Sequence, residues 1–160
     1  MGVFMLADST PVARALSLMN IPYRLFCHAG PIESLEQAAR ERGQQPEQVV
    51  RSILFRLEKD KYIMVLAAGP AQISWQALRR YLGQSRLTMA KPEEVLAVTG
   101  YAIGTVSPFG LPAPLRILMD ESVLTQDELS MGSCEKGVGI IMGREDLMRA
   151  LGEVEAGCFT

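Results

Sequence analysis

The segment from residue 51 to 68 constrains the fold more than any other part of the sequence. Two runs with strand character, 51–57 and 62–68, flank a charged turn at 58–61, a pattern that is typical of a β-hairpin. The second run is apolar at every position of 63–68. A strand with one face in water would alternate between apolar and polar residues, so this strand is predicted to lie inside a sheet.

Capping residues and apolar periodicity predict further helices and strands around the hairpin. Thr10 followed by Pro11 is a helix start, and apolar residues then recur at helical spacing as far as Met19. Other helices are expected at 34–43, 46–50, 74–83, 92–98 and 144–151, and other strands at 23–27, 101–106, 115–119 and 138–142. This mixed order of strands and helices favours an α/β (α+β) domain built around one mixed β-sheet.

The length and the apolar content are those of one domain. The chain has 160 residues, of which 48% are hydrophobic, enough for a sizeable core. We expect an N-terminal extension at 1–9, the domain proper at 10–151, and a loosely held C-terminal tail at 152–160. No apolar stretch is long enough to span a membrane, and 1–7 lack the basic region of a signal peptide.

The cysteines give no sign of a disulfide framework or a metal site. Cys27, Cys134 and Cys158 are odd in number and form no CxxC pair, so neither a set of disulfides nor a zinc site is predicted. A reducing cytoplasm is the simplest location for such a chain. The sequence implies no metal and no organic cofactor.

Positive charge is concentrated in one segment. The net charge is −2, yet residues 51–91 hold eight of the sixteen basic residues and only two acids. Such clustering can form a positive face that meets phosphate groups. The alternative is that these side chains scatter over several faces of the molecule.

The most unusual local pattern is a glycine-rich loop. Gly100, Gly104 and Gly110 enclose Ser107 and Pro108 at the expected end of a strand. Glycine permits positive φ and close approach of the backbone to a ligand, and proline stiffens the turn. Such a loop can direct several backbone N–H groups at one carbonyl or phosphate; the alternative is a plain turn after a strand.

Several short motifs, in the order in which they occur along the chain, resemble the motifs of one family. Gly104-x-x-x-Pro108 resembles the GxxxP loop of the YbaK/EbsC family, the free-standing relatives of the prolyl-tRNA synthetase editing domain. Further likenesses are Ile21-Pro22-Tyr23, His28-Ala-Gly-Pro31, the segment from Pro46 through Arg51-Ser-Ile-Leu-Phe55, Met119-Asp120, and Gly132-Ser-Cys-Glu-Lys-Gly137. The resemblance spans roughly residues 10–150.

The resemblance implies a fold, a reaction and a substrate. It implies a curved mixed sheet that forms a cleft, and hydrolysis of the ester between an amino acid and the terminal adenosine of tRNA. The tRNA's own 2′-hydroxyl would help to activate water, and loop N–H groups would bind near the ester. The expected partners are aminoacyl-tRNA and, as a second candidate, an aminoacyl-tRNA synthetase. This mechanism needs no Ser/His/Asp or metal motif, and the sequence contains none.

The family pattern assigns roles to individual residues. It places catalysis on Arg51, Gly104, Ser107 and Pro108, and substrate binding on Thr105, Val106, Gly132, Ser133 and Cys134. Arg51 stands where most members have lysine, so it could act as a positive clamp but not as a base. Gly139 stands where an acidic residue is common, which suggests a pocket for a different amino acid.

Other residues have both a functional and a structural interpretation. Tyr23 and Phe26 could wall the aminoacyl pocket or fill the core, and His28 could donate a hydrogen bond in the pocket or be structural. Cys134 could be a nucleophile, although it has no histidine near it in sequence. Arg79, Arg80 and Arg86 are candidates for binding the tRNA backbone, with solvated surface as the alternative.

Three functions are therefore open. The leading one is a trans-editing hydrolase of mischarged aminoacyl-tRNA. The second is a binding module of the same fold that holds tRNA or a nucleotide-like ligand without hydrolysing it, a possibility raised by Arg51. The third is a small hydrolase of another acyl ester.

Overall fold

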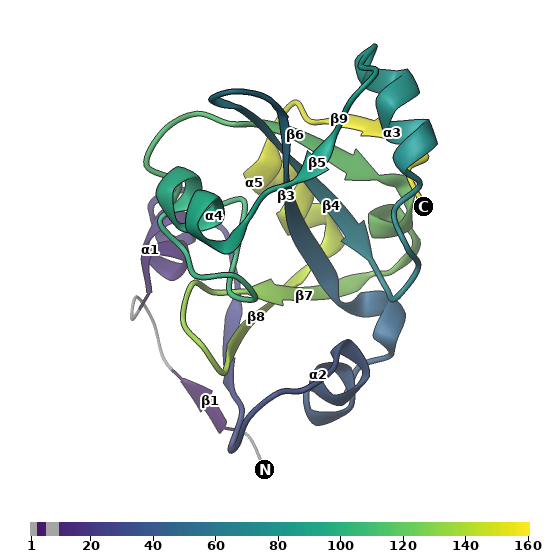
Figure 1. Ribbon diagram of the computed structural model, residues 1–160. Coiled ribbons are helices and arrows are strands. Elements are labelled where there is room, and N and C mark those ends of the chain that lie inside the picture. Colours follow the sequence, from purple (N-terminus) through teal and green to yellow (C-terminus); the bar gives the residue numbers. More distant parts are fainter. Residues whose placement is uncertain (1–2, 6–9) are drawn as a thin grey trace.

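The hairpin expected from the sequence forms the centre of the structure, a computed structural model that describes residues 3–5 and 10–160 (Figure 1). Strands β3 (Val50–Glu58) and β4 (Lys61–Ala68) pair antiparallel over their whole length. Side chains on both faces of β4 are buried from Ile63 to Ala68. The prediction that this strand lies inside a sheet is confirmed.

The hairpin belongs to the larger of two sheets. The strand order is β5-β3-β4-β6-β9, in which β5 is Thr88–Met89, β6 is Arg116–Asp120 and β9 is Glu155–Gly157. β6 runs parallel to β4, and β9 runs parallel to β6, while β3 and β5 are antiparallel. The sheet is therefore mixed, as expected.

A second, antiparallel sheet packs beside the first. Its order is β1-β2-β8-β7, in which β1 is Val3–Met5, β2 is Arg24–Cys27, β8 is Val138–Gly143 and β7 is Glu128–Gly132. One parallel bridge, between Val49 and Ser130, links the two sheets. The expectation of one sheet is thus wrong. Each sheet has an apolar face, and two stacked sheets bury both of these faces against each other.

Five α-helices cover these sheets in the described part of the chain. They are α1 (Pro11–Leu18), α2 (Leu35–Glu41), α3 (Trp75–Leu82), α4 (Pro92–Thr99) and α5 (Arg144–Leu151), with single 3-10 turns at Pro46–Gln48 and Glu121–Thr125. Thr10, Ser34 and Ser74 cap the first three helices with their hydroxyl oxygens, as their sequence positions predict. The predicted mixed α/β single-domain fold is confirmed.

The alternation of side chains along β3 divides the interior into two cores. Val50 and Leu54 belong to the larger core, which also takes residues from the second sheet and from α1, α4 and α5. Ile53 and Phe55 point to the opposite face and join a smaller core under α3. Any residue of β3 therefore faces one core or the other according to its position in this alternation.

The C-terminal segment is part of the smaller core. β9 pairs with β6, and the Phe159 side chain is 1% exposed. The Phe159 N–H donates to the Asp120 carboxylate over 2.6 Å, and its carbonyl accepts from the Ser74 N–H over 2.6 Å. The expectation of a loosely held tail is wrong, because the Phe159 side chain packs into the smaller core beside α3.

Asp120 is the anchor of this segment. Its carboxylate is fully buried and accepts from Ser122, Phe159 and Thr160. Burial alone would raise the pKa of Asp120, but these hydrogen bonds outweigh it and hold the pKa below its usual value. The carboxylate is therefore ionised when it holds the segment.

No helix in the described residues is long and apolar enough to cross a membrane.

Phe159→Ala tests whether the C-terminal segment supports the fold. Loss of a fully buried aromatic side chain is expected to lower the free energy of unfolding by about 3 to 5 kcal/mol. Urea denaturation followed by circular dichroism measures this change. Cys158→Ala is the matched control, because Cys158 is exposed and its truncation should cost less than about 0.5 kcal/mol. Equal stability of the two variants would contradict the packing described above.

Candidate functional site

The glycine-rich segment after α4 is a loop, not the strand expected over residues 101–106. Gly100 caps the C-terminus of α4 with a φ of +78°, and Gly104 has a φ of +86°. The Thr105 N–H turns back to the Ala102 carbonyl over 3.0 Å. Positive φ at both glycines is incompatible with extended strand geometry, so the backbone coils over the end of the larger core.

Tyr101 closes this loop. Its hydroxyl lies 2.6 Å from the Phe109 carbonyl oxygen and 2.8 Å from that of Gly110, so one buried side chain holds both ends of the segment together. Burial raises the pKa of Tyr101 to about 12. A Cβ at position 110 would lie 2.5 Å from the tyrosine oxygen, which explains the glycine there. The sequence analysis missed this role, although a tyrosine next to a glycine-rich segment is a signal for it.

A second loop packs directly on the first. Gly132, the last residue of β7, lies so close to the loop that a Cβ there would be 2.8 Å from the Thr105 carbonyl oxygen and 2.7 Å from that of Val106. The Cys134 N–H donates to the Thr105 carbonyl over 2.9 Å. The structure therefore brings together two of the segments that the sequence singled out, 104–108 and 132–134.

Several N–H groups of the first loop remain available. The N–H groups of Gly104, Val106 and Ser107 donate to no acceptor among the described residues. Val106 and Ser107 are buried, with exposures of 8% and 0%. Buried N–H groups are nearly always paired in proteins, so these donors are suited to bind an oxygen of a ligand.

The side chains of the two loops are mostly occupied by the protein itself. The Ser107 hydroxyl accepts from the Phe109 N–H over 3.2 Å, and the Ser133 hydroxyl donates to the Val138 carbonyl over 2.7 Å. Pro108 is buried. The loops thus offer backbone donors rather than a side-chain nucleophile.

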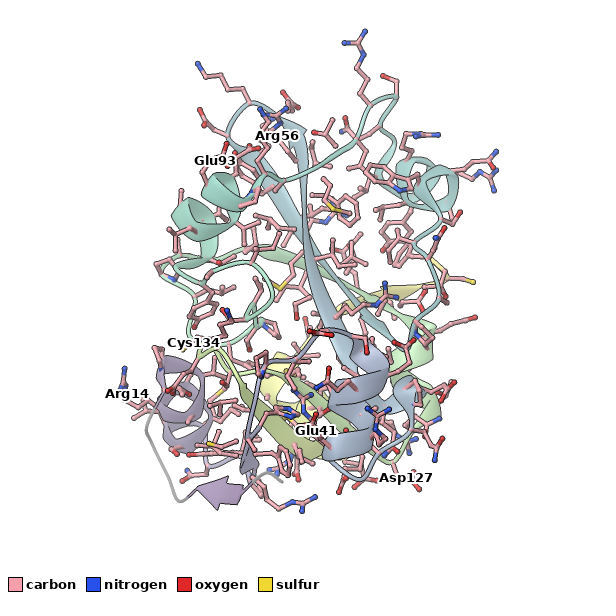
Figure 2. The ribbon with its side chains drawn as sticks, turned by 60° about the horizontal axis from the view of Figure 1, so that its bottom comes forward. Arg14, Glu41, Arg56, Glu93, Asp127 and Cys134 are labelled. Atoms are coloured by element: carbon pink, nitrogen blue, oxygen red, sulfur yellow. The ribbon has the colours of Figure 1, made fainter. Side chains whose placement is uncertain are left out.

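Cys134 has a strained backbone and an unreactive thiol. Its φ is +75°, one of three positive values among the non-glycine residues described. Burial raises the pKa of the thiol, while a hydrogen bond from the Val12 N–H acts in the opposite direction. Figure 2 shows Cys134 above α1, on the side that carries Arg14. A thiol whose pKa is raised is a poor nucleophile at neutral pH.

The His28 N–H donates to the Gly137 carbonyl over 2.8 Å, just beyond the second loop, while its side chain lies in a polar network with Glu41 and Arg42 at the end of α2. The Arg42 Nε–H donates to His28 Nε2 over 3.1 Å, and His28 Nδ1 lies 3.0 Å from a Glu41 carboxylate oxygen. Arginine has no acceptor, so Nε2 must be the acceptor and Nδ1 must carry the proton that Glu41 accepts. Both ring nitrogens are occupied, and the ring is almost fully buried.

Arg42 completes this network against the second sheet. Its guanidinium donates to the Ser130 hydroxyl over 2.9 Å and lies over Gly139, where a Cβ would meet it at 2.5 Å. Burial lowers the pKa of Arg42 to about 10, so the group stays charged at neutral pH. Gly139 is therefore glycine because the guanidinium of Arg42 fills the space beside it.

Tyr23 and Phe26 make contacts within and beside the second sheet. The Tyr23 hydroxyl lies 3.0 Å from that of Ser17 on α1, and the Tyr23 side chain packs against the larger core. The Phe26 ring meets the His28 ring edge-on at a centroid distance of 4.9 Å.

Arg51 faces the other side of the larger sheet. It lies in one row with Ala67 and Asp120 across three strands, on the face that carries Ile53 and Phe55. Its guanidinium donates to the Ala71 carbonyl. Burial lowers the pKa of Arg51, and the Asp120 carboxylate opposes that shift. The glycine-rich loop packs on the opposite face through Val106 and Phe109, so the structure does not bring Arg51 to it.

Ser52, the next residue of β3, faces the side of the glycine-rich loop. Its hydroxyl is buried and has no hydrogen-bond partner among the described residues. A buried hydroxyl without a partner costs free energy. Ser52 is therefore a candidate for binding a ligand, and the sequence analysis missed it as it missed the role of Tyr101. Strand alternation is the signal that could have found it, because neighbouring residues on a strand face opposite sides.

The three candidate RNA-binding arginines fall in two places. Arg79 and Arg80 lie in the last turn of α3, which stands beside β9 at the upper right of Figure 1. Arg86 lies in the segment that leads from α3 to β5 and lines a cleft at the hairpin end. Among the described residues, no group of three or more His, Cys, Asp or Glu side chains is placed to hold a metal ion.

Comparison with known proteins gives consistent matches. A family model described as the aminoacyl-tRNA editing domain matches residues 29–150. The proline–tRNA ligase of Kosmotoga olearia is 29% identical over 147 residues, which cover 88% of this chain and 24% of the ligase. The uncharacterised protein YwhH of Bacillus subtilis is 38% identical over 90 residues, which cover 56% of this chain and 57% of YwhH.

The match to a solved structure extends over the whole fold. A crystal structure of a protein proposed to be a trans-editing enzyme for prolyl-tRNA synthetase superposes with a TM-score of 0.85. The two sequences are 25% identical, and the superposition covers 98% of this chain and 99% of the other. The chain spans only about a fifth to a quarter of the proline–tRNA ligases that it matches and just over half of YwhH.

Tyr101→Phe tests how the glycine-rich loop is held. The change leaves two carbonyl groups without their shared donor, so the free energy of unfolding should fall by about 1 to 3 kcal/mol. Amide hydrogen exchange should become faster than in the wild type at Phe109, whose N–H donates to the Ser107 hydroxyl, and at Cys134, whose N–H donates to the Thr105 carbonyl. Tyr81→Phe is the matched control, since the Tyr81 hydroxyl contacts only Glu155 on the surface; unchanged exchange in Tyr101→Phe would rule out the fastening role.

Proposed function

Because the chain belongs to the aminoacyl-tRNA editing domain family, we propose that it hydrolyses the ester between a wrong amino acid and the 3′ end of tRNA. The observation that carries this proposal is the set of unpaired N–H groups at Gly104, Val106 and Ser107. Two of these residues, Val106 and Ser107, are buried. Donors preorganised in a site of low polarity stabilise the negative charge that develops on a carbonyl oxygen during ester hydrolysis.

The reaction needs positioning more than a protein nucleophile. The ester carbonyl oxygen would accept from the loop N–H groups, and water would attack the carbonyl carbon. The bond from this carbon to the ribose oxygen then breaks, which releases the amino acid and the free tRNA end. The neighbouring ribose hydroxyl of the substrate would orient the water. The Ser107 and Ser133 hydroxyls, which are bonded within the protein, take no part in the bond changes.

Gly132 keeps the loop in its working position in this scheme. Its lack of a side chain lets β7 contact the Thr105 and Val106 carbonyl groups directly. The peptide units that carry those carbonyls also carry the Val106 and Ser107 N–H groups. A displacement of either carbonyl therefore rotates the donors away from the substrate.

The second candidate is a binding module of the same fold without hydrolysis. It is favoured by the orientation of Arg51, whose guanidinium faces the Ala71 carbonyl and Asp120 rather than the loop. A clamp by Arg51 would require the side chain to reach across the sheet. The clamp stays a prediction, and the orientation of the side chain argues for a structural role instead.

Deacylation of charged tRNA distinguishes these functions. We expect turnover on one or more members of a panel that starts with proline tRNA carrying non-cognate amino acids, because the matched ligases are proline–tRNA ligases. Gly132→Ala should lower kcat by about a hundredfold, since small displacements of a reacting group have effects of this size. Gly30→Ala is the matched control, because nothing lies within 4 Å of a Cβ at position 30.

Each outcome of this panel supports one function. RNA binding without turnover on any charged tRNA would favour the binding module. Turnover of simple aminoacyl esters but not of charged tRNA would favour a hydrolase of another ester. If Gly132→Ala keeps the wild-type kcat, the loop N–H groups take no part in the mechanism.

Arg51 variants separate a structural role from a clamp. Arg51→Ala should lower the free energy of unfolding by about 1 kcal/mol through loss of the bond to Ala71, while kcat for deacylation stays near the wild-type value. Stability is measured by urea denaturation and kcat on the substrate found in the panel. Loss of turnover in Arg51→Ala together with full turnover in Arg51→Lys would support the clamp and contradict the structural role.

A further inference from the structure

A polar cleft lies at the hairpin end of the larger sheet. Its volume is about 660 Å³, and its walls come from the β3–β4 turn, the segment before β5 and the start of α4. Figure 2 shows Arg56 and Glu93 at this end of the molecule. The charged residues that line the cleft are Arg56, Glu58, Lys59, Asp60, Arg86, Lys91, Glu93 and Glu94.

Two of the acids in the cleft are already neutralised. The Glu94 carboxylate accepts from the Tyr62 hydroxyl over 2.7 Å and pairs with Arg56 at 3.3 Å. The hydrogen bond from the Tyr62 hydroxyl is the main cause that holds the pKa of Glu94 below its usual value, and the hydrogen bond from the Lys91 N–H adds to it. Glu58 pairs with Lys61 at 3.3 Å. A cation therefore compensates the charge of each of these two carboxylates.

The remaining cations have no such partner. Lys59, Arg86 and Lys91 form no ion pair with any residue that the structure describes. Against them stand two further acids, Asp60 and Glu93. The lining carries four cations and four acids, and Lys61, which pairs with Glu58 beside the cleft, brings the sum at this end of the molecule to +1 in a protein whose net charge is −2. Three unpaired cations around one concave surface are suited to phosphate oxygens.

Rigid elements hold these cations in place. β5 pairs with β3 through Met89 opposite Phe55 and Thr88 opposite Arg56, which fixes the chain just after Arg86. The Ala90 N–H donates to the Leu54 carbonyl over 3.0 Å, and the Lys91 N–H donates to Glu94 over 3.1 Å. The backbone on both sides of β5 is thus tied to the sheet and to α4.

The cleft lies on the same face of the larger sheet as the glycine-rich loop. Arg56 follows Leu54 in the alternation of β3, so it points to the face against which the loop packs. α4 runs from the cleft, at Lys91, to the loop, at Gly100. Its eight residues span about 12 Å. A chain of nucleotides that placed its last ribose at the loop could therefore cross α4 and pass the cleft.

We propose that this cleft binds phosphate groups of the single-stranded 3′ end of an RNA whose terminal ribose lies at the glycine-rich loop. The inference rests on the proposed function, because it takes the RNA as part of the substrate. It moves the main RNA contact away from Arg79 and Arg80, which lie on the far side of the larger sheet on α3. Of the three arginines singled out in the sequence, it retains Arg86.

Binding of an RNA hairpin that has a single-stranded 3′ overhang and carries no amino acid tests the proposal. Fluorescence anisotropy over a range of KCl concentrations should give a Kd that is about five- to tenfold higher for Arg86→Ala and for Lys91→Ala, and a salt slope lower by about one. Glu93→Gln should bind more tightly than the wild type, because it removes a repulsive charge. Arg40→Ala, on α2 at the opposite end of the molecule (Figure 1), is the matched control and should bind like the wild type.

Deacylation kinetics separate this inference from the proposed function. Arg86→Ala and Lys91→Ala should raise KM and leave kcat unchanged, whereas a change at the loop lowers kcat. If the wild type deacylates tRNA while both cleft variants keep the wild-type Kd and KM, the cleft inference is overturned and the function stands. If the wild type neither binds the hairpin nor deacylates tRNA, both are overturned.

Discussion

The alternation of side chains along β3 governs the arrangement of the whole molecule. Successive residues of this strand enter different cores, Val50 and Leu54 on one face and Ile53 and Phe55 on the other. Because each face of the strand carries a core, the side chains of β3 pack on one core or the other according to their position in the strand. The same rule sends Arg51 toward the C-terminal segment, and it turns Ser52 toward the glycine-rich loop.

Much of the fold could be predicted because its signals are local. The hairpin, the helix caps at Thr10, Ser34 and Ser74, and the buried strand β4 all follow from short patterns. The features that were missed depend on contacts between distant residues. The division into two sheets results from apolar faces that meet only in three dimensions, and the docking of Phe159 depends on a hole formed by α3 and β6.

The candidate site shows the same division. The spacing of glycine and proline identified the loop, because these residues determine the backbone conformation at their own positions. The fastening of the loop by Tyr101 and its contact with Gly132 involve partners that lie eight or more residues apart. The family pattern singled out Arg51, and His28 was a candidate for a hydrogen bond in the pocket, but such polar groups can equally hold two elements together. Arg51 bonds to Ala71, and His28 joins Glu41 to Arg42.

The placement of Phe159 bears on how the protein is made. The smaller core needs this ring, and β9 can pair only with a β6 strand that is already formed. A chain emerging from the ribosome therefore exposes the apolar face beneath α3 until Phe159 has left the ribosome. Pairing of β9 with β6 has to wait for residues 155–157, and a ribosome that stalls before residue 159 leaves a nascent chain whose smaller core is uncovered and prone to aggregate.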